Sequence, residues 1–222
     1  MKTDQSSEII NRLLQKWPDP KIELDYSNAF ELLIATILAA QCTDSRVNMV
    51  TRTFFKQYPT ADSIAKENPD VIADRIRSTG FYRNKAKSLI ACCQRLVQDY
   101  GGQVPDSVEK LSSLPGVGRK TANIVLGNAL GVQAIAVDTH LKRTALRLGL
   151  SSARNSDHVE QELMDIVDPG QWTLFTKLMI LHGRYICQAR RPRCRECPLY
   201  DICPYEEKSD RAGRAIATNH RS

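Results

Sequence analysis

The sequence predicts an all-α protein, and three observations support this fold class. Apolar residues recur mostly at intervals of three and four, strict two-residue alternation is almost absent, and proline or glycine separates the periodic segments. The only tempting strand is Ala-Ile-Ala-Val at 134–137, which we interpret as a buried connector. With 222 residues, of which 42% are hydrophobic, the chain can bury a sizeable core, so a disordered or collagen-like protein is excluded.

The expected helices can be followed along the chain. The first carries apolar side chains on one face from Ile9 to Trp17, and Pro18 ends it because proline cannot continue a helix. Residues 29–42 are apolar nearly all round, which predicts a central, buried helix. Two further helices are expected to begin at a capping residue, one at Asp44 or Ser45 and one at Asp106 or Ser107. The remaining expected helices span 61–77, with a break at Pro69, and 82–100, 118–130, 138–150, 157–167 and 172–187.

The positive charge of the chain is concentrated near its end. The formal net charge is +6, and from His182 onward nine basic residues stand against five acidic ones, so four of the six net charges lie there. A local basic excess indicates a polyanionic partner such as nucleic acid. The alternative is a solubilising surface without a specific partner.

Neither a membrane span nor a disulfide framework is expected. The longest apolar stretches, such as 32–40, are too short to cross a bilayer, and the polar start lacks the apolar region of a signal peptide. The seven cysteines are an odd number, which indicates a reducing compartment rather than disulfides. We therefore expect a soluble, cytoplasmic protein.

Residues 114–122, L-P-G-V-G-R-K-T-A, predict a hairpin between two helices that binds a phosphate. Glycines at two positions allow positive φ and leave the amides at the next helix N-terminus open to an anion. The candidate contacts are Gly116, Val117, Gly118, Arg119 and Thr121. A nucleotide-binding P-loop is excluded because Arg119 separates Gly118 from Lys120, and a dinucleotide fingerprint lacks its third glycine and its strand. A helix C-cap would explain Gly116 alone.

Two residues near this hairpin are candidates for catalysis. Lys120 is expected in the first helical turn, where Arg119 and the helix N-terminus favour loss of the ammonium proton and so a nucleophilic amine. Asp138 is expected at a helix N-cap, where a fixed, ionised carboxylate can stabilise a cation or accept a proton. The alternatives are a solvated lysine and a purely structural cap. His140 is either a phosphate contact or a surface residue.

Four cysteines near the end of the chain predict a metal centre. Cys187, Cys194, Cys197 and Cys203 are spaced C-x6-C-x2-C-x5-C. Such a set fits tetrahedral zinc or a 4Fe-4S cluster, and the single C-x2-C pair favours the cluster over a zinc ribbon. His182 is expected to be buried in the last helix rather than to be a ligand. The arginines around the cysteines, of which Arg184, Arg191 and Arg193 are candidate contacts, suit phosphate binding.

Taken in order, these motifs resemble the endonuclease III family of DNA glycosylases in the helix-hairpin-helix superfamily. The resemblance rests on F-E-L-L-I-A-T-I-L-A-A-Q-C-T-D, L-P-G-V-G-R-K-T-A-N, A-V-D-T-H, H-G-R-Y-I-C and the cysteine spacing. It implies a bilobal fold with the active site in the cleft between the two domains. One is a six-helix barrel at 22–132, and the other is a 4Fe-4S cluster domain made of 1–21 and 133–204, followed by a flexible tail at 205–222.

The resemblance also implies an activity, with duplex DNA that contains damaged pyrimidines or abasic sites as the partner of a monomer. A bifunctional glycosylase and abasic-site lyase would excise oxidised pyrimidines in base excision repair. Lys120 would attack C1′ and form a Schiff base that breaks the strand by β-elimination, and Asp138 would assist it. Gln41 and Phe81 would fill the gap left by the flipped nucleotide, although the family often has leucine where Phe81 stands. Otherwise Gln41 is a helix-end amide and Phe81 a core aromatic.

Two other functions remain as alternatives. An adenine-mismatch DNA glycosylase shares the hairpin, the aspartate and the cluster, but that family lacks a lysine at the position of Lys120 and carries a further C-terminal domain. A non-catalytic, metal-stapled DNA-binding module would use the same hairpin and arginines. It would leave the joint occurrence of Lys120 and Asp138 without a reason.

Overall fold

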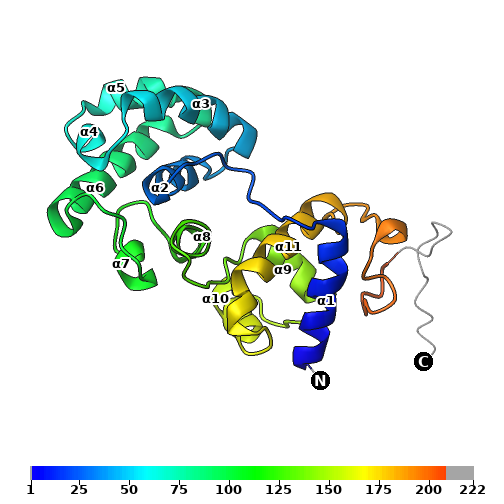
Figure 1. The fold of residues 1–222 in the computed structure, drawn as a ribbon. Helices are drawn as coiled ribbons and strands as arrows, with labels where there is room; N and C mark the ends of the chain where they lie inside the picture. Colours follow the sequence, from blue (N-terminus) through cyan, green and yellow to red (C-terminus); the bar gives the residue numbers. More distant parts are fainter. Residues whose placement is uncertain (1, 209–222) are drawn as a thin grey trace. The chain divides into compact units, whose positions relative to one another are not determined.

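The computed structural model describes residues 2–208, and all regular secondary structure in that range is helical (Figure 1). The predicted all-α class is therefore confirmed. Residues 134–137 form a buried connector, as expected, and join no sheet. Of the helices in the described part of the chain, none has the length and apolar character needed to cross a membrane. Most of the expected flexible tail, residues 209–222, lies outside the described residues.

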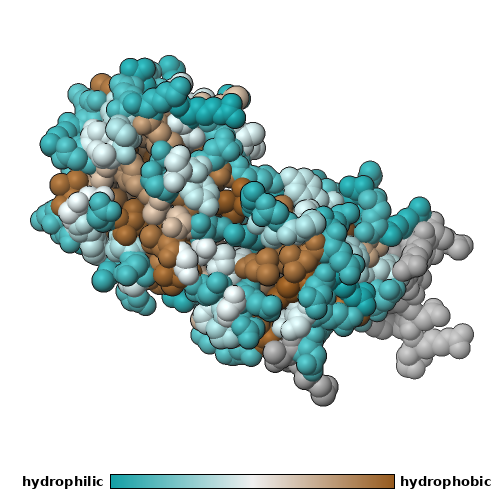
Figure 2. Space-filling model, viewed as in Figure 1, coloured by the Kyte–Doolittle hydropathy of each residue, from teal (hydrophilic) through white to brown (hydrophobic). Residues whose placement is uncertain are grey.

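The chain divides into two compact units, each with its own hydrophobic core. The central unit comprises Ile22–Ala134, and the terminal unit combines Met1–Lys21 with Ile135–Ser222. The apolar side chains of each unit pack among themselves into a separate cluster. On the face shown in Figure 2, hydrophilic residues cover much of each unit, and patches of hydrophobic residues are visible within each unit.

The central unit is built around α2 and α6. Its helices are α2 (Ala29–Leu38), α3 (Asp44–Gln57), α4 (Ala61–Ala65), α5 (Pro69–Arg75), α6 (Tyr82–Tyr100), α7 (Val108–Ser112) and α8 (Arg119–Ala129), with a 3-10 turn η1 (Arg77–Thr79). Helix α2 is buried on nearly every side, as its composition predicts. The short helices α4 and α5 pack on α6, and α8 packs on α2 and α7.

Helix α2 ends earlier than the sequence predicts, at Leu38 instead of Cys42. The Leu38 carbonyl, which a continuing helix would bond to the amide of residue 42, accepts a hydrogen bond from the Lys85 ammonium. The Cys42 amide turns back to the Ala39 carbonyl, and Gln41 adopts a left-handed backbone with φ of 54°. The end of α2 therefore depends on a lysine 47 residues away.

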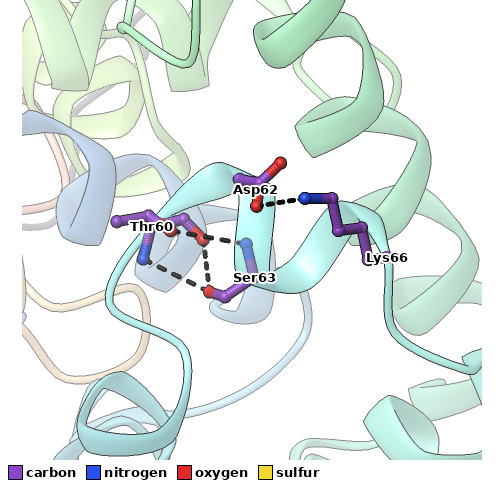
Figure 3. Close-up of polar contacts among 4 residues, drawn as sticks. All are labelled: Thr60, Asp62, Ser63 and Lys66. Carbon is purple, nitrogen blue, oxygen red and sulfur yellow. Dashed lines mark hydrogen bonds and ion pairs between the residues drawn. The ribbon is translucent and has the colours of Figure 1, made fainter.

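Side-chain caps fix where several helices begin. In α4, the Thr60 hydroxyl accepts from the Ser63 amide, and the Ser63 hydroxyl accepts from the Thr60 amide, both at 3.3 Å (Figure 3). Lys66 and Asp62, four residues apart, form an ion pair beside the same helix. The expected cap Ser107 is confirmed for α7, whereas α3 is capped by Thr43 rather than by Asp44 or Ser45.

The terminal unit joins the start of the chain to its last third. Its helices are α1 (Lys2–Lys16), α9 (Thr139–Arg147), α10 (Ser156–Met164) and α11 (Trp172–Tyr185), with 3-10 turns η2 (Pro169–Gln171) and η3 (Cys194–Glu196). Helix α1 packs on α11 (Figure 1). The Ser6 hydroxyl donates to the Ile166 carbonyl at 2.8 Å, and Arg12 donates to the Pro198 carbonyl at 3.1 Å. Residues 205–208 continue along the cysteine segment, where Lys208 donates to the Cys203 carbonyl.

Candidate functional site

The glycine hairpin lies between α7 and α8, and its two glycines differ. Gly116 has φ of 78°, and a Cβ there would meet the Ser88 Cβ at 2.9 Å, so both the backbone and the close packing require glycine. Gly118 has φ of −93° and open space where a Cβ would lie, so the expectation of positive φ at both glycines is wrong for Gly118. Val117, between them, is buried and anchors the turn to the core.

Helix α8 begins directly after the hairpin with an uncovered N-terminus. Gly118 is its N-cap residue, and no side chain caps the helix. Arg119 and Lys120 are exposed in the first turn, and Thr121 is half-buried beside them. The predicted place of Lys120 in the first helical turn is thus confirmed. An N-terminus without a side-chain cap leaves backbone N–H groups available to an anion.

Asp138 caps α9, as the sequence predicts. Its Oδ1 accepts a hydrogen bond of 2.7 Å from the Leu141 amide, and the side chain is half-buried. The buried residues Ile135 and Val137 hold the preceding connector in the core of the terminal unit. The hydrogen bond from the Leu141 amide therefore fixes the position of the carboxylate.

His140 stands in the first turn of α9, where α9 and α11 make a close approach. A Cβ at Gly183 would meet the His140 Cβ at 2.9 Å and the His140 carbonyl oxygen at 3.0 Å, so only glycine fits at this place. Arg143, on the next turn of α9, donates to the Gly183 carbonyl at 2.7 Å. The glycine in H-G-R-Y thus allows α11 to support the helix that Asp138 caps.

Two residues predicted to enter the DNA duplex occupy strained backbone conformations. In the described chain, the non-glycine residues with positive φ are Gln41, Phe81 and Arg191, at 54°, 48° and 53°. All three are candidate DNA contacts, and such strain collects at functional sites because other contacts must maintain it. Phe81 is 63% exposed, so the alternative of a core aromatic is wrong. Gln41 lies beyond the end of α2 and is also exposed.

Gln41, Phe81 and Gly116 border one hollow in the surface of the central unit. The hollow has a volume of about 170 Å³, and Ile37, Ala40, Asn84, Lys85 and Ser88 complete its lining. Three segments far apart in the sequence, residues 37–41, 81–88 and the glycine hairpin, therefore meet at one place. The structure brings together the hairpin and both residues predicted to fill the gap in DNA.

The four cysteines of the C-terminal segment surround one pocket. Cys187, Cys194, Cys197 and Cys203 all line it, together with Arg147 and His182. Burial raises the pKa of the Cys197 thiol to about 12, and burial also raises the pKa of Cys203. In the described chain, no three His, Cys, Asp or Glu side chains are close enough to hold one metal ion. His182 is 1% exposed within α11, as predicted.

Two arginines of α9 that the sequence analysis did not single out hold the start of this segment. Arg147 donates to the Cys187 sulfur at 3.4 Å and to the Gln188 carbonyl at 2.8 Å, and its guanidinium lies 4.5 Å from the centre of the Tyr205 ring. Arg143 donates to the Cys187 carbonyl at 3.1 Å. The only signal in the sequence was their four-residue spacing on one helical face.

The three predicted arginine contacts lie in different surroundings. Arg184 is half-buried in the last turn of α11, while Arg191 and Arg193 are exposed. The Arg193 guanidinium binds both carboxylate oxygens of Glu196, at 3.0 and 2.6 Å. A phosphate that approaches Arg193 must therefore compete with an exposed ion pair, which is a weak competitor.

Comparison with known proteins gives one consistent result. Residues 34–169 match the HhH-GPD superfamily base excision DNA repair protein family. The chain is 44% identical to endonuclease III of Synechocystis over 94% of this chain and 95% of that protein. It is 41% identical to endonuclease III of Escherichia coli K12, over 91% and 96% of the two chains. A solved structure of a trapped endonuclease III–DNA covalent intermediate matches with a TM-score of 0.87 at 41% identity, over 92% of this chain and 97% of that one.

Proposed function

Because the chain belongs to the endonuclease III family of the HhH-GPD superfamily, we propose that it excises oxidised pyrimidines from duplex DNA. It is a DNA glycosylase and abasic-site lyase of base excision repair. The observation that carries the proposal is Lys120, exposed in the first turn of a helix that has no side-chain cap and directly follows the glycine hairpin. With DNA as substrate and bacterial relatives, we place the protein in the cytoplasm as a monomer.

In the proposed reaction, Lys120 is the nucleophile. The lone pair of its Nζ forms a bond to C1′ of the damaged nucleotide, and the C1′–N glycosidic bond breaks with its electrons going to the departing base. Asp138 accepts the proton that the amine gives up. Opening of the sugar ring yields a Schiff base, and loss of a C2′ proton expels the 3′ phosphate by β-elimination.

The remaining predicted residues hold the DNA while this happens. The amides at the start of α8 would bind one backbone phosphate, and the open space at Gly118 leaves room for it. A base must leave the duplex stack to be reached, and its departure leaves a gap. The exposed Phe81 ring and the Gln41 amide would fill that gap, and Thr121, His140 and the three arginines would contact phosphates.

The four cysteines would hold a 4Fe-4S cluster, and their surroundings fit it. Four thiols and no carboxylate line the pocket, which is the soft ligand set that iron-sulfur clusters use. The Arg147 guanidinium donates to the Cys187 sulfur and holds that side chain at the edge of the pocket. When bound, the cluster cross-links the segment that carries Arg191 and Arg193. A visible iron-sulfur absorption spectrum tests the cluster, and a colourless protein with stoichiometric zinc would refute it.

We propose that the central unit is the six-helix barrel domain and the terminal unit the cluster domain.

Borohydride trapping tests the enzymatic mechanism. Wild-type protein, duplex DNA with an oxidised pyrimidine or an abasic site, and borohydride should give a covalent adduct on gels. Lys120→Ala should abolish the adduct, Asp138→Asn should slow it, and Lys110→Ala, at an exposed lysine of α7, should not change it. An adenine-mismatch glycosylase would release adenine without this adduct, and a non-catalytic module would bind DNA without releasing a base. An undiminished adduct with Lys120→Ala would exclude Lys120 as the nucleophile.

A further inference from the structure

Lys85 is a buried lysine that the proposed reaction does not use. It stands in the first turn of α6 and is only 6% exposed. Its ammonium donates to the Leu38 carbonyl at 2.8 Å and to the Thr79 carbonyl at 2.7 Å, and both contacts are buried. Burial lowers the pKa of this amine, because the charged form loses water. A lysine is seldom buried this far unless its charge has specific partners.

The two acceptors lie just before the two residues proposed to enter the duplex. Leu38 is the last residue of α2, three residues before Gln41, and Thr79 ends η1, two residues before Phe81. The backbone amide of Lys85 also donates to the Phe81 carbonyl at 3.0 Å. One residue is thus bonded to both segments, and the positive charge lies at the C-terminal end of α2, where helix carbonyls favour a cation.

Both segments need such support because their conformations are strained. Gln41 and Phe81 have φ of 54° and 48°. This left-handed backbone region is unfavourable for every residue that has a Cβ atom. Phe81 is also largely exposed, so packing of its own side chain does little to stabilise this backbone conformation. Gln41, Phe81 and the Lys85 side chain border the same hollow of the central unit.

We propose that Lys85 is a positioning residue that fixes Gln41 and Phe81 relative to each other, so that both enter the duplex as one rigid wedge. This inference rests on the proposed function, in which these two residues fill the gap left by the flipped nucleotide. Lys85 touches neither the substrate nor the reacting atoms. Its effect is therefore confined to substrates in which a nucleotide must be extruded from a stack and replaced.

The test compares duplex with single-stranded DNA, each containing one abasic site. Lys85→Met keeps an unbranched side chain that is one atom shorter and removes both hydrogen bonds. We expect adduct formation with borohydride to slow about tenfold or more on the duplex, because stacking by the wedge is lost, and to stay near the wild-type rate on the single strand. A 2-aminopurine base beside the lesion should also show less unstacking in the duplex complex.

Three variants make the comparison specific. Lys85→Arg, which keeps a cation and several donors, should recover most of the duplex rate. Adding Lys85→Met to Phe81→Ala should cause little further loss, since the lysine acts through the wedge. Leu96→Ala, a buried position further along α6, is a matched control for lost stability and should not slow the duplex selectively. If Lys85→Met does not fold, Lys85→Gln, which removes the positive charge but stays polar, replaces it and should also slow the reaction selectively on the duplex.

The outcomes separate this inference from the function on which it rests. Equal slowing on duplex and single strand, or no slowing on either, would overturn the positioning role while leaving the lyase in place. Additive losses in the double variant would overturn it as well. If the wild-type protein forms no adduct with either substrate, the proposed function itself fails.

Discussion

At the scale of single residues, the two glycines of the hairpin lack a side chain for different reasons. Gly116 has a left-handed backbone and lies against Ser88, so the fold itself requires glycine there. Gly118 has an ordinary extended backbone and open space around it, so the fold alone would accept a larger residue. Glycine is a favoured N-cap residue, and the proposed phosphate contact gives a further reason for the absence of a side chain at Gly118.

Alanine substitutions should separate these two roles. Gly116→Ala should lower the free energy of unfolding by about 2–4 kcal/mol, from left-handed strain and the contact with Ser88. Gly118→Ala should lower that free energy by only about 1 kcal/mol, the cost of alanine at an N-cap, and weaken binding to duplex DNA. Urea unfolding and a binding titration at fixed salt measure both quantities. Equal binding by Gly118→Ala and wild type would argue against a phosphate at the start of α8.

The ion pair of Arg193 and Glu196 leads to a second prediction at this scale. Glu196→Gln removes the carboxylate that competes with a phosphate for the Arg193 guanidinium. We expect tighter DNA binding, with the slope of log K against log salt steeper by up to about 0.9, the value for one added phosphate contact. Glu8→Gln, which removes an exposed carboxylate from α1, is the control. Weaker binding, or the same gain from both variants, would contradict a role of Arg193 in DNA binding.

At the scale of helices, Gly183 controls how closely α9 and α11 pack. Its place against His140 leaves no room for a methyl group, and its carbonyl accepts from Arg143. A larger residue must push the start of α9 outward, and Asp138 is the cap at that end. The position of the proposed proton acceptor therefore depends on a residue far along the chain, in the last long helix.

Gly183→Ala should thus affect stability and catalysis together. We expect a loss of about 1–3 kcal/mol in the free energy of unfolding, as for overpacked cores, and slower adduct formation. His158→Ala, at an exposed residue of α10, should change the free energy of unfolding by less than about 0.5 kcal/mol. Thermal unfolding and borohydride trapping are the measurements. A fully active Gly183→Ala variant would show that the spacing of α9 and α11 is not critical.

The sequence predicts those parts of the fold and site that depend on near neighbours. The caps Ser107 and Asp138 and the place of Lys120 follow from residues within one helical turn. The end of α2 does not, because its last carbonyl is bonded to Lys85.

Residues that act through long-range contacts leave little local signal. Arg147 holds a cysteine 40 residues away, and the backbone of Phe81 is left-handed although phenylalanine has no preference for that region. Phe81 is exposed directly after the η1 turn and Gly80. From the sequence alone, Phe81 is expected to enter DNA only because of the family resemblance, with a buried core aromatic as the alternative.

At the scale of the whole molecule, the cysteine pocket belongs to only one of two separate cores. All four cysteines lie in the terminal unit, whereas Cys92 and Cys93 are buried in the central unit. Stabilisation by a bound cluster should therefore be uneven along the chain, since binding to a folded site stabilises the unit that contains it.

Hydrogen exchange should reveal this unevenness. Cys197→Ser, which removes a proposed ligand, should speed amide exchange in α9 and α11 and leave α2 and α6 nearly as protected as in the wild type. Cys93→Ser, which places a hydroxyl in the central core, should have the reverse pattern. Uniform acceleration in both units by either variant would mean that the two cores unfold together.

The bonds that tie α1 to the end of the chain set the order in which the protein can be completed on the ribosome. Residues 22–134 form a contiguous core that can close as soon as they emerge. Helix α1 emerges before this core, but its partners Ile166 and Pro198 are made only after the core is complete. At ~5–20 residues per second, the apolar face of α1 waits on the order of 10–40 s for them. Among the described helices, α1 thus remains longest without the segments on which it packs.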